Sequence, residues 1–193
     1  MVAENEVCGW YPQAKVVRSP HFNARPAAEV SLLVIHNISL PAGQFGTPYV
    51  DALFCGTLDC HAHESFADLQ GLEVSAHFLI RRDGELVQYV SCDERAWHAG
   101  VSSFQGRSHC NDFAVGIELE GTDNLPFTKE QYQQLVGLTD WLMGRYPQIT
   151  ASRIVGHSDI APGRKTDPGP CFDWSGYLAA IAGAVPGATS KDE

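Results

Sequence analysis

The segment Val30–Ile35 constrains the fold of this chain more than any other feature. It is a short apolar run rich in β-branched residues. A run of this kind, without polar alternation, predicts a strand that is buried on both faces. His36 and Asn37 follow it directly, so we expect their side chains at the carboxyl end of a buried strand.

Three further segments predict strands. Val74–Ile80 and Glu85–Val90 are separated by a loop that ends in Asp-Gly, and such a pair between two apolar runs predicts a hairpin. Asp112–Glu120 alternates between apolar and polar residues, which places Glu118 and Glu120 on the face opposite its apolar side chains.

Helices are predicted between and after these strands. Thr128–Gln131 fits a capping box and opens the clearest helix, which Pro147 ends. Pro48–Phe54 predicts a helical turn or two, and Asp173 can cap a final helix that runs through Val185. Strands interleaved with helices predict a mixed α/β fold, with a central mixed β-sheet flanked by helices.

The bulk properties limit the partners and the compartment. A length of 193 residues predicts one domain, with a core over about residues 9–185 and short frayed termini. The net charge of −10 at pH 7 argues against a nucleic acid or an anionic membrane as partner. We expect a cytoplasmic protein with reduced thiols, because we find no export signal, no membrane-spanning run and no CxxC pair.

Two histidines and one aspartate are placed to hold a metal ion. His36 and His157 each follow an apolar strand directly, the second after Arg153–Gly156. Asp167 lies ten residues beyond His157 in a Thr-Asp-Pro-Gly-Pro loop, where turn formation is the competing explanation for an aspartate. Zinc takes such ligands, and three of them leave a fourth position for water. The spacing therefore predicts a hydrolytic zinc centre.

Two more residues could complete that chemistry. Glu118 could take a proton from the metal-bound water and return it to a leaving amine. The alternative is that Glu118 and Glu120 both line a solvated face; since both cannot be buried as ions without cost, we expect one of them to be structural. Lys165 could stabilise an oxyanion, although a solvated loop lysine is the simpler interpretation of that residue alone.

The remaining histidines are expected to have ordinary roles. Four of them lie in polar, loop-like segments and are expected in solvent: His21, His61, His63 and His109. His77 and His98 lie near predicted strand ends, and we expect them to pack in the core or to line a pocket rather than to bind metal.

Five motifs resemble those of a known family, in matching order and spacing over roughly Gly9–Val185. The chain is similar to the zinc amidases of the 1,6-anhydro-N-acetylmuramyl-L-alanine amidase type (AmpD type), which are related to peptidoglycan recognition domains. The motifs are Ser31–Pro41, Val74–Gly84, Arg95–Gly100, Cys110–Asp123 and Gly156–Pro170.

The resemblance implies an enzyme, a fold and an active site. It implies a zinc amidase that cleaves the amide between anhydro-N-acetylmuramic acid and the L-alanine of cytosolic muropeptides, during peptidoglycan recycling in the cell. In this sequence the implied zinc ligands are His36, His157 and Asp167. Glu118 is the implied proton acceptor, and Lys165 is the implied transition-state stabiliser.

The resemblance is less specific about the substrate pocket. Asn37 beside a ligand and Trp97 in its own motif are expected as wall residues. In related enzymes basic residues hold the acidic stem peptide; here His109 and Glu73 stand at such positions, so Arg107 could supply the charge instead.

Three alternative functions would use the same residues. A non-catalytic muropeptide-binding module typically lacks part of the metal set, whereas this chain keeps the whole set. An amidase acting on intact peptidoglycan would need export, and no export signal is found. A purely structural zinc would leave no open position, whereas three ligands do.

Overall fold

The computed structural model describes residues 9–184. A mixed sheet of six strands crosses the molecule in the order β1-β5-β4-β9-β3-β10. β3 lies between β9 and β10 and is parallel to both. β4 is parallel to β9 and antiparallel to β5. The bounds are β1 Lys15–Val16, β3 Leu32–Ile38, β4 Phe78–Ile80, β5 Leu86–Gln88, β9 Ala114–Glu120 and β10 Ile154–Gly156.

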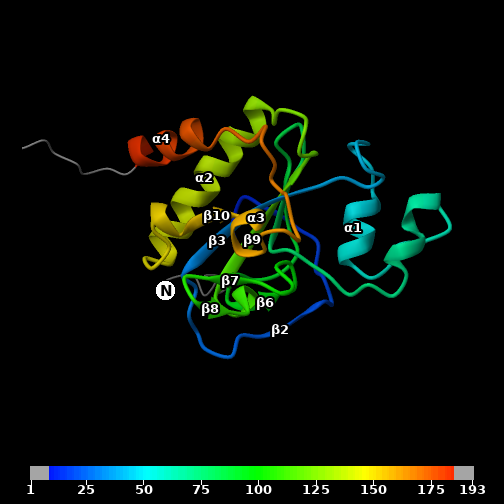
Figure 1. Cartoon of the computed structure of the whole chain (residues 1–193), viewed down its shortest axis with the longest axis horizontal. Coiled ribbons are helices and arrows are strands. Elements are labelled where there is room, and N and C mark those ends of the chain that lie inside the picture. The colour runs from blue at the N-terminus through cyan, green and yellow to red at the C-terminus, as the bar shows by residue number, and fades with distance from the viewer. Residues whose placement is uncertain (1–8, 185–193) are drawn as a thin grey trace, which may run out of the picture.

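Helices and two small ribbons surround this sheet. In Figure 1, α2 and α4 lie together over one face, while α1 lies apart from them on the other side of the sheet. The helices are α1 Tyr49–Phe54, α2 Lys129–Arg145, α3 His157–Ile160 and α4 Trp174–Ala184. The ribbons pair β2 Phe22–Ala24 with β6 Glu94–Ala96, and β7 Ser103–Phe104 with β8 Arg107–Ser108. Short 3₁₀ turns span Glu64–Leu69, Cys110–Asp112 and Ala151–Arg153.

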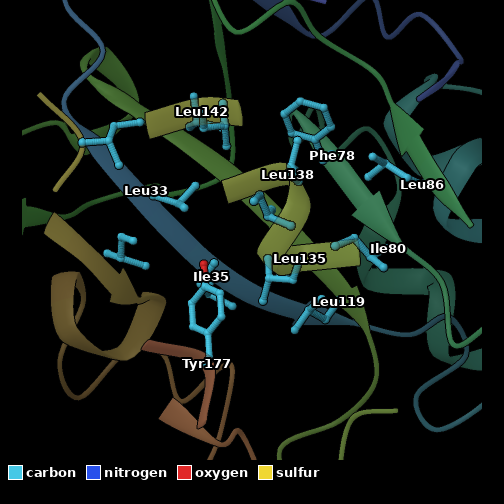
Figure 2. Close-up of a cluster of buried hydrophobic side chains, with 14 of the residues drawn as sticks. Leu33, Ile35, Phe78, Ile80, Leu86, Leu119, Leu135, Leu138, Leu142 and Tyr177 are labelled. Atoms are coloured by element: carbon cyan, nitrogen blue, oxygen red, sulfur yellow. The ribbon is translucent and has the colours of Figure 1, made fainter. Parts of the chain in front are cut away.

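The main hydrophobic core lies between the sheet and α2. Alternate residues of β3 and β9 point into it, as strand geometry requires. Burial of each such aliphatic side chain stabilises the fold by about 1.5–3 kcal/mol. Figure 2 shows the leucines of α2 facing the strand residues, with Tyr177 of α4 beside them; the labelled strand residues are Leu33, Ile35, Phe78, Ile80, Leu86 and Leu119.

The start of α2 is fixed to the sheet by one glutamine. Thr128 and Gln131 form the predicted capping box: Thr128 Oγ1 accepts from the Gln131 backbone N–H at 3.1 Å, and Gln131 Oε1 accepts from the Thr128 N–H at 3.0 Å. The Gln131 amide also donates to the carbonyls of Ile80 and Glu120. The cap therefore sets both the first turn of α2 and its position over β4 and β9.

The opposite face of the sheet carries two smaller hydrophobic clusters with polar residues between them. One cluster packs α1 against β4 and β5, and includes Leu53, Phe54 and Leu79. The other includes Leu32 and Val34 of β3 together with Phe113. His36 and Glu118 lie on this face, because they alternate with the residues that enter the main core.

The strand predictions are confirmed, with one difference of consequence. β3 runs through Ile38 instead of ending at Ile35, because it stays in register with β9 from Leu32 opposite Ala114 to Ile38 opposite Glu120. His36 and Asn37 are therefore inside the strand rather than after it. The Asp-Gly hairpin is formed, although β4 and β5 have only three residues each.

The helix predictions are confirmed over the described residues. α1 begins one residue after Pro48, α2 ends two residues before Pro147, and Asp173 accepts a hydrogen bond from the Gly176 N–H at the start of α4. Val185 and the predicted frayed termini lie outside the described residues. The five cysteines within residues 9–184 are free thiols: Cys55, Cys60, Cys92, Cys110 and Cys171. Within residues 9–184, no helix combines the length and apolarity needed to cross a membrane.

Candidate metal centre and active site

Three adjacent parallel strands bring the predicted site residues together. β9, β3 and β10 are neighbours, and their register places His36 of β3 directly opposite Glu118 of β9. Gly156 of β10 pairs with Ile35, so His157 follows at the level of His36. Side chains that share a level on adjacent strands lie on the same face, since the strands alternate together.

His36, His157 and Asp167 converge on one point. The Nδ1 atoms of the two histidines are 3.0 Å apart, and each lies 3.1 Å from Oδ2 of Asp167. Both imidazoles are almost completely buried. Asp167 reaches them from the loop after α3, where its carbonyl accepts from the Ser158 N–H.

The donor set fits a zinc ion. Two imidazole nitrogens and a carboxylate oxygen are common zinc ligands, and tetrahedral bonds of about 2.1 Å place neighbouring donors about 3.4 Å apart. The observed separations of 3.0–3.1 Å are close to that value. Lone pairs on these nitrogen and oxygen atoms would repel one another at such distances, and a cation bound between them would remove that repulsion. Among the described residues this is the group of histidine and acidic side chains that could hold a metal ion.

The protonation states of His36 and Asp167 suit metal binding. Burial lowers the pKa of His36 to about 4, which leaves its ring neutral at pH 7. Burial alone would raise the pKa of Asp167, but the close contacts of its Oδ2 atom with His157 and His36 hold that pKa below its usual range. Asp167 is therefore a carboxylate that faces the neutral ring of His36.

Glu118 has the opposite environment. Its side chain is 8% exposed, and its Oε2 atom has no hydrogen-bond partner within residues 9–184. Burial raises its pKa well above the usual range; the nearby Asp167 carboxylate raises it further, and Lys165 opposes the shift. A carboxyl group in this environment can gain and lose a proton at moderate pH, as a general acid and base must.

Glu120 is the structural member of the pair. One carboxylate oxygen accepts from the Gly46 N–H at 2.7 Å, and the other accepts from the Arg82 N–H at 3.1 Å. Arg81 lies 3.5 Å away. Although both glutamates are buried, only Glu118 faces the metal-binding residues, which confirms the expectation that one of them is structural.

A cavity of about 240 Å³ opens over these residues. Lys165 lines it from an exposed position, where its ammonium can approach a substrate. The rest of the lining mixes polar and apolar side chains: His36, Asn37, Ile38, Leu53, Phe54, Leu72, Val74, Ser75, Trp97, His98, Glu118, His157 and Asp167. Three residues that could hold a metal ion, a buried carboxyl group and a lysine thus share one cavity, and this constellation is suited to hydrolysis of an amide.

Comparison with known proteins decides the family. The model of the N-acetylmuramoyl-L-alanine amidase family matches residues 26–170, and this span contains every predicted site residue. The chain belongs to the N-acetylmuramoyl-L-alanine amidase family. It is therefore an enzyme of the amidase class.

Individual relatives agree with the family and the fold. The chain is 61% identical over 174 residues to the 1,6-anhydro-N-acetylmuramyl-L-alanine amidase AmpD of Citrobacter freundii, covering 90% of this chain and 92% of the relative. The crystal structure of a selenomethionine derivative of AmpD superimposes with a TM-score of 0.88 at 60% identity, covering 90% of this chain and 97% of that one. The predicted zinc amidase fold is thereby confirmed.

A more distant amidase structure contains a ligand. Escherichia coli AmiD, in complex with the substrate anhydro-N-acetylmuramic acid-L-Ala-D-γ-Glu-L-Lys, superimposes with a TM-score of 0.58 at 31% identity. The match covers 82% of this chain and 60% of that one.

Two of the predicted wall residues of this amidase reach the cavity. The Asn37 amide donates to Oδ1 of Asp123 at 2.7 Å and to the carbonyl of Pro168 at 3.1 Å, so it also holds the loop after Asp167. The Trp97 indole N–H donates to Oδ1 of Asn23 at 3.0 Å. Both residues line the cavity.

Arg107 does not reach the cavity of the amidase. It lies on β8, where its guanidinium donates to both carboxylate oxygens of Glu29 at 2.9 Å and covers the ring of Phe113. It lines a separate hollow together with Ser31 and Arg153. The structure therefore places this predicted substrate-binding residue away from the site, because Arg107 pairs with Glu29, which is distant in sequence, and packs on the nearby ring of Phe113.

The other histidines of the amidase divide as predicted, with two exceptions. His61 and His109 are exposed, and His77 is fully buried. His21 and His63, which were expected in solvent, are half-buried, and His21 stacks on Trp97 with ring centroids 6.1 Å apart. That contact joins the segment before β2 to the loop after β6, and nothing in the sequence around His21 signals it.

Sequence reasoning missed two groups of site residues. The apolar wall includes Leu53, Phe54, Leu72 and Val74; of these four residues only Val74 falls within one of the five motifs, Val74–Gly84. His98 was expected to line a pocket and does so, but its contact with His36 was not foreseen. The only signal in the sequence was the place of His98 within the motif Arg95–Gly100.

Proposed function

We propose that this amidase is a zinc-dependent 1,6-anhydro-N-acetylmuramyl-L-alanine amidase of the cytoplasm. Its reaction is hydrolysis of the amide between the lactyl group of anhydro-N-acetylmuramic acid and the L-alanine of a muropeptide, as a step of peptidoglycan recycling. The observation that carries the proposal is the convergence of His36, His157 and Asp167 beside Glu118. The 61% identical relative named for this activity supports the choice of substrate.

The chain's own residues would divide the work as follows. His36, His157 and Asp167 would hold the zinc ion, which when bound polarises a carbonyl and lowers the pKa of water toward about 7. Glu118 accepts the proton of the attacking water and delivers it to the departing L-alanine nitrogen. The raised pKa of Glu118 suits this exchange, because a proton that is bound too weakly could not be returned.

Lys165 supplies positive charge where the oxyanion develops. It lines the same cavity as Glu118 and Asp167, and one well-placed donor stabilises such a transition state by about 3 kcal/mol. Asn37 and Trp97 line the cavity that the substrate would occupy. The partner is thus a small muropeptide; the net charge of −10 speaks against nucleic acid and anionic membrane surfaces.

The alternatives make different demands on the same residues. A muropeptide-binding module without catalysis has no use for a buried carboxyl group such as that of Glu118, whose Oε2 atom has no hydrogen-bond partner within residues 9–184 and whose burial costs stability. An amidase acting on the polymeric wall would use the same chemistry on a larger substrate. Only the substrate distinguishes that enzyme from the proposed one.

The test is incubation with anhydromuropeptide and, separately, with intact sacculi, each with and without a chelator. Mass spectrometry of the products should show free stem peptide from the anhydromuropeptide, and none in the presence of the chelator. Release of stem peptide from sacculi alone would contradict the recycling role. Equal release with and without the chelator would contradict the zinc dependence.

A further inference from the structure

We propose that His98 and the carbonyl of Ala99 form a shared outer support that orients both zinc-binding histidines, and that Asn111 fixes this support. The inference deepens the proposed function and rests on its zinc site. His98 and Asn111 are positioning residues in it, because they would act through His36 and His157 rather than on the substrate.

The first contact sets the orientation of His36. Its Nδ1 atom faces the metal-binding point, while its Nε2 atom lies 2.9 Å from Nδ1 of His98. A neutral imidazole that offers the lone pair of Nδ1 to a cation carries its proton on Nε2. The Nε2–H group of His36 therefore donates a hydrogen bond to Nδ1 of His98, which fixes the tautomer and the ring plane of His36.

The second contact does the same for His157. Its Nδ1 atom also faces the metal-binding point, and its Nε2 atom lies 3.1 Å from the carbonyl oxygen of Ala99. The Arg164 guanidinium donates to the same oxygen and to the carbonyl of Val101. Two consecutive residues of one loop, His98 and Ala99, thus each accept a hydrogen bond from one of the two rings.

The loop is itself held by a single side chain. Oδ1 of Asn111 accepts hydrogen bonds from the backbone N–H of His98 at 3.2 Å and of Ala99 at 2.8 Å. Gly116 of β9 leaves the room that His98 needs, since a Cβ atom there would lie 2.5 Å from the imidazole ring. Asn111 therefore fixes the backbone of His98 and Ala99, and Gly116 provides the space for the His98 ring.

Simple packing does not account for His98. Its Nε2 atom is buried and has no hydrogen-bond partner in the described part of the chain. A buried polar atom without a partner costs stability, and an apolar side chain would fill the same space without that cost. Retaining an imidazole is explained if its Nδ1 atom is needed as the acceptor for His36.

The test compares two substitutions of His98 in the full-length, zinc-loaded enzyme. His98→Asn keeps an acceptor oxygen at the same distance along the side chain as Nδ1, whereas His98→Leu removes it at similar volume. Zinc affinity is measured by competition with a chromophoric chelator, and the ligand field by the visible spectrum after Co²⁺ replacement. His61→Leu, at an exposed histidine outside the cavity, is the matched control.

We expect His98→Leu to bind zinc about 10–100-fold more weakly, with an altered Co²⁺ spectrum and a lower kcat at saturating zinc. His98→Asn should recover most of the affinity and the wild-type spectrum, and His61→Leu should match wild type throughout. Wild-type affinity and spectrum in folded His98→Leu would overturn the inference. Equal losses in the Leu and Asn variants would also overturn it, because they would indicate packing alone.

A second pair of substitutions, at Asn111, tests the inference if His98→Leu does not fold. Asn111→Asp keeps the Oδ1 acceptor and Asn111→Leu removes it, so the same ranking of zinc affinities is expected, and equal affinities would count against the support. Failure of the proposed function has a different signature. In that case wild-type protein would not bind stoichiometric zinc at all.

Discussion

Glu118→Gln should inactivate the enzyme and at the same time stabilise its metal-free fold. The substitution keeps the shape of the side chain but removes a carboxyl group that is 8% exposed and whose Oε2 atom has no partner among the described residues. Loss of a general acid and base lowers kcat by at least about 10²–10⁴-fold. Zinc content should stay near one per chain, because Glu118 is not one of the three converging donors.

The stability gain comes from removing the charge, because the amide of the variant is also a buried polar group but never ionises. A buried polar group without a hydrogen bond costs about 1–3 kcal/mol, and a charged one costs more. With an extra cost of about 1–3 kcal/mol for the charged form, and about 2–4 °C in Tm per 1 kcal/mol for a chain of this length, a rise of about 2–12 °C is expected at neutral pH. Glu120→Gln is the matched control on the same strand. It should lower Tm, because the Glu120 carboxylate is hydrogen-bonded to Gly46 and Arg82 and lies beside Arg81.

The increase in Tm caused by Glu118→Gln should grow as pH rises. Burial raises the pKa of Glu118 above its usual value of 4.5, so above about pH 4.5 the unfolded chain releases a proton that the folded protein retains. The contribution of Glu118 to the free energy of unfolding therefore falls as pH rises through this window. The difference in Tm between Glu118→Gln and wild type should be small near pH 4 and grow toward pH 7.

Thermal unfolding of the metal-free proteins, followed by circular dichroism at several pH values, measures this difference. A Glu118→Gln variant that is less stable than wild type at pH 7 would refute the reasoning about its burial. A variant with full activity would refute its assignment as the proton-transfer group.

The other predictions concern the zinc ligand His36, Lys165, and Arg107, which lies outside the cavity. His36→Ala should lose bound zinc, measured by elemental analysis of the purified protein; stoichiometric zinc in this variant would remove His36 from the ligand set. Lys165→Ala should lower kcat by about 10²–10³-fold with zinc content unchanged, and steady-state kinetics that show only a raised KM would assign Lys165 to ground-state binding. Arg107→Ala should leave kcat/KM nearly unchanged, since Arg107 pairs with Glu29 outside the cavity; a large rise in KM would place it at the substrate after all.

Local sequence patterns were sufficient to predict the strands that carry the site residues. The apolar run at Val30–Ile35, the alternation around Glu118 and the short strand before His157 each carry their own signal, and the parallel pairing of β9, β3 and β10 then brings their side chains together. The separate roles of Glu118 and Glu120 were also foreseeable, because two buried carboxylates on one face need different environments.

Contacts between distant segments account for what sequence reasoning could not supply. The extension of β3 to Ile38 depends on its pairing with β9, and the position of Arg107 depends on Glu29. The contact between His98 and His36 requires the space above Gly116. None of these partners is marked by periodicity or spacing, since each is selected by how the sheet assembles.

The position of the bond that is cleaved tests the central claim most directly. Purified enzyme is incubated with anhydro-N-acetylmuramyl tripeptide, before and after removal of zinc, and both products are identified by mass spectrometry. The proposed function predicts free anhydro-N-acetylmuramic acid and an intact tripeptide that begins with L-alanine, formed only by the zinc-loaded enzyme. Cleavage within the peptide, or undiminished turnover by the zinc-free enzyme, would contradict it.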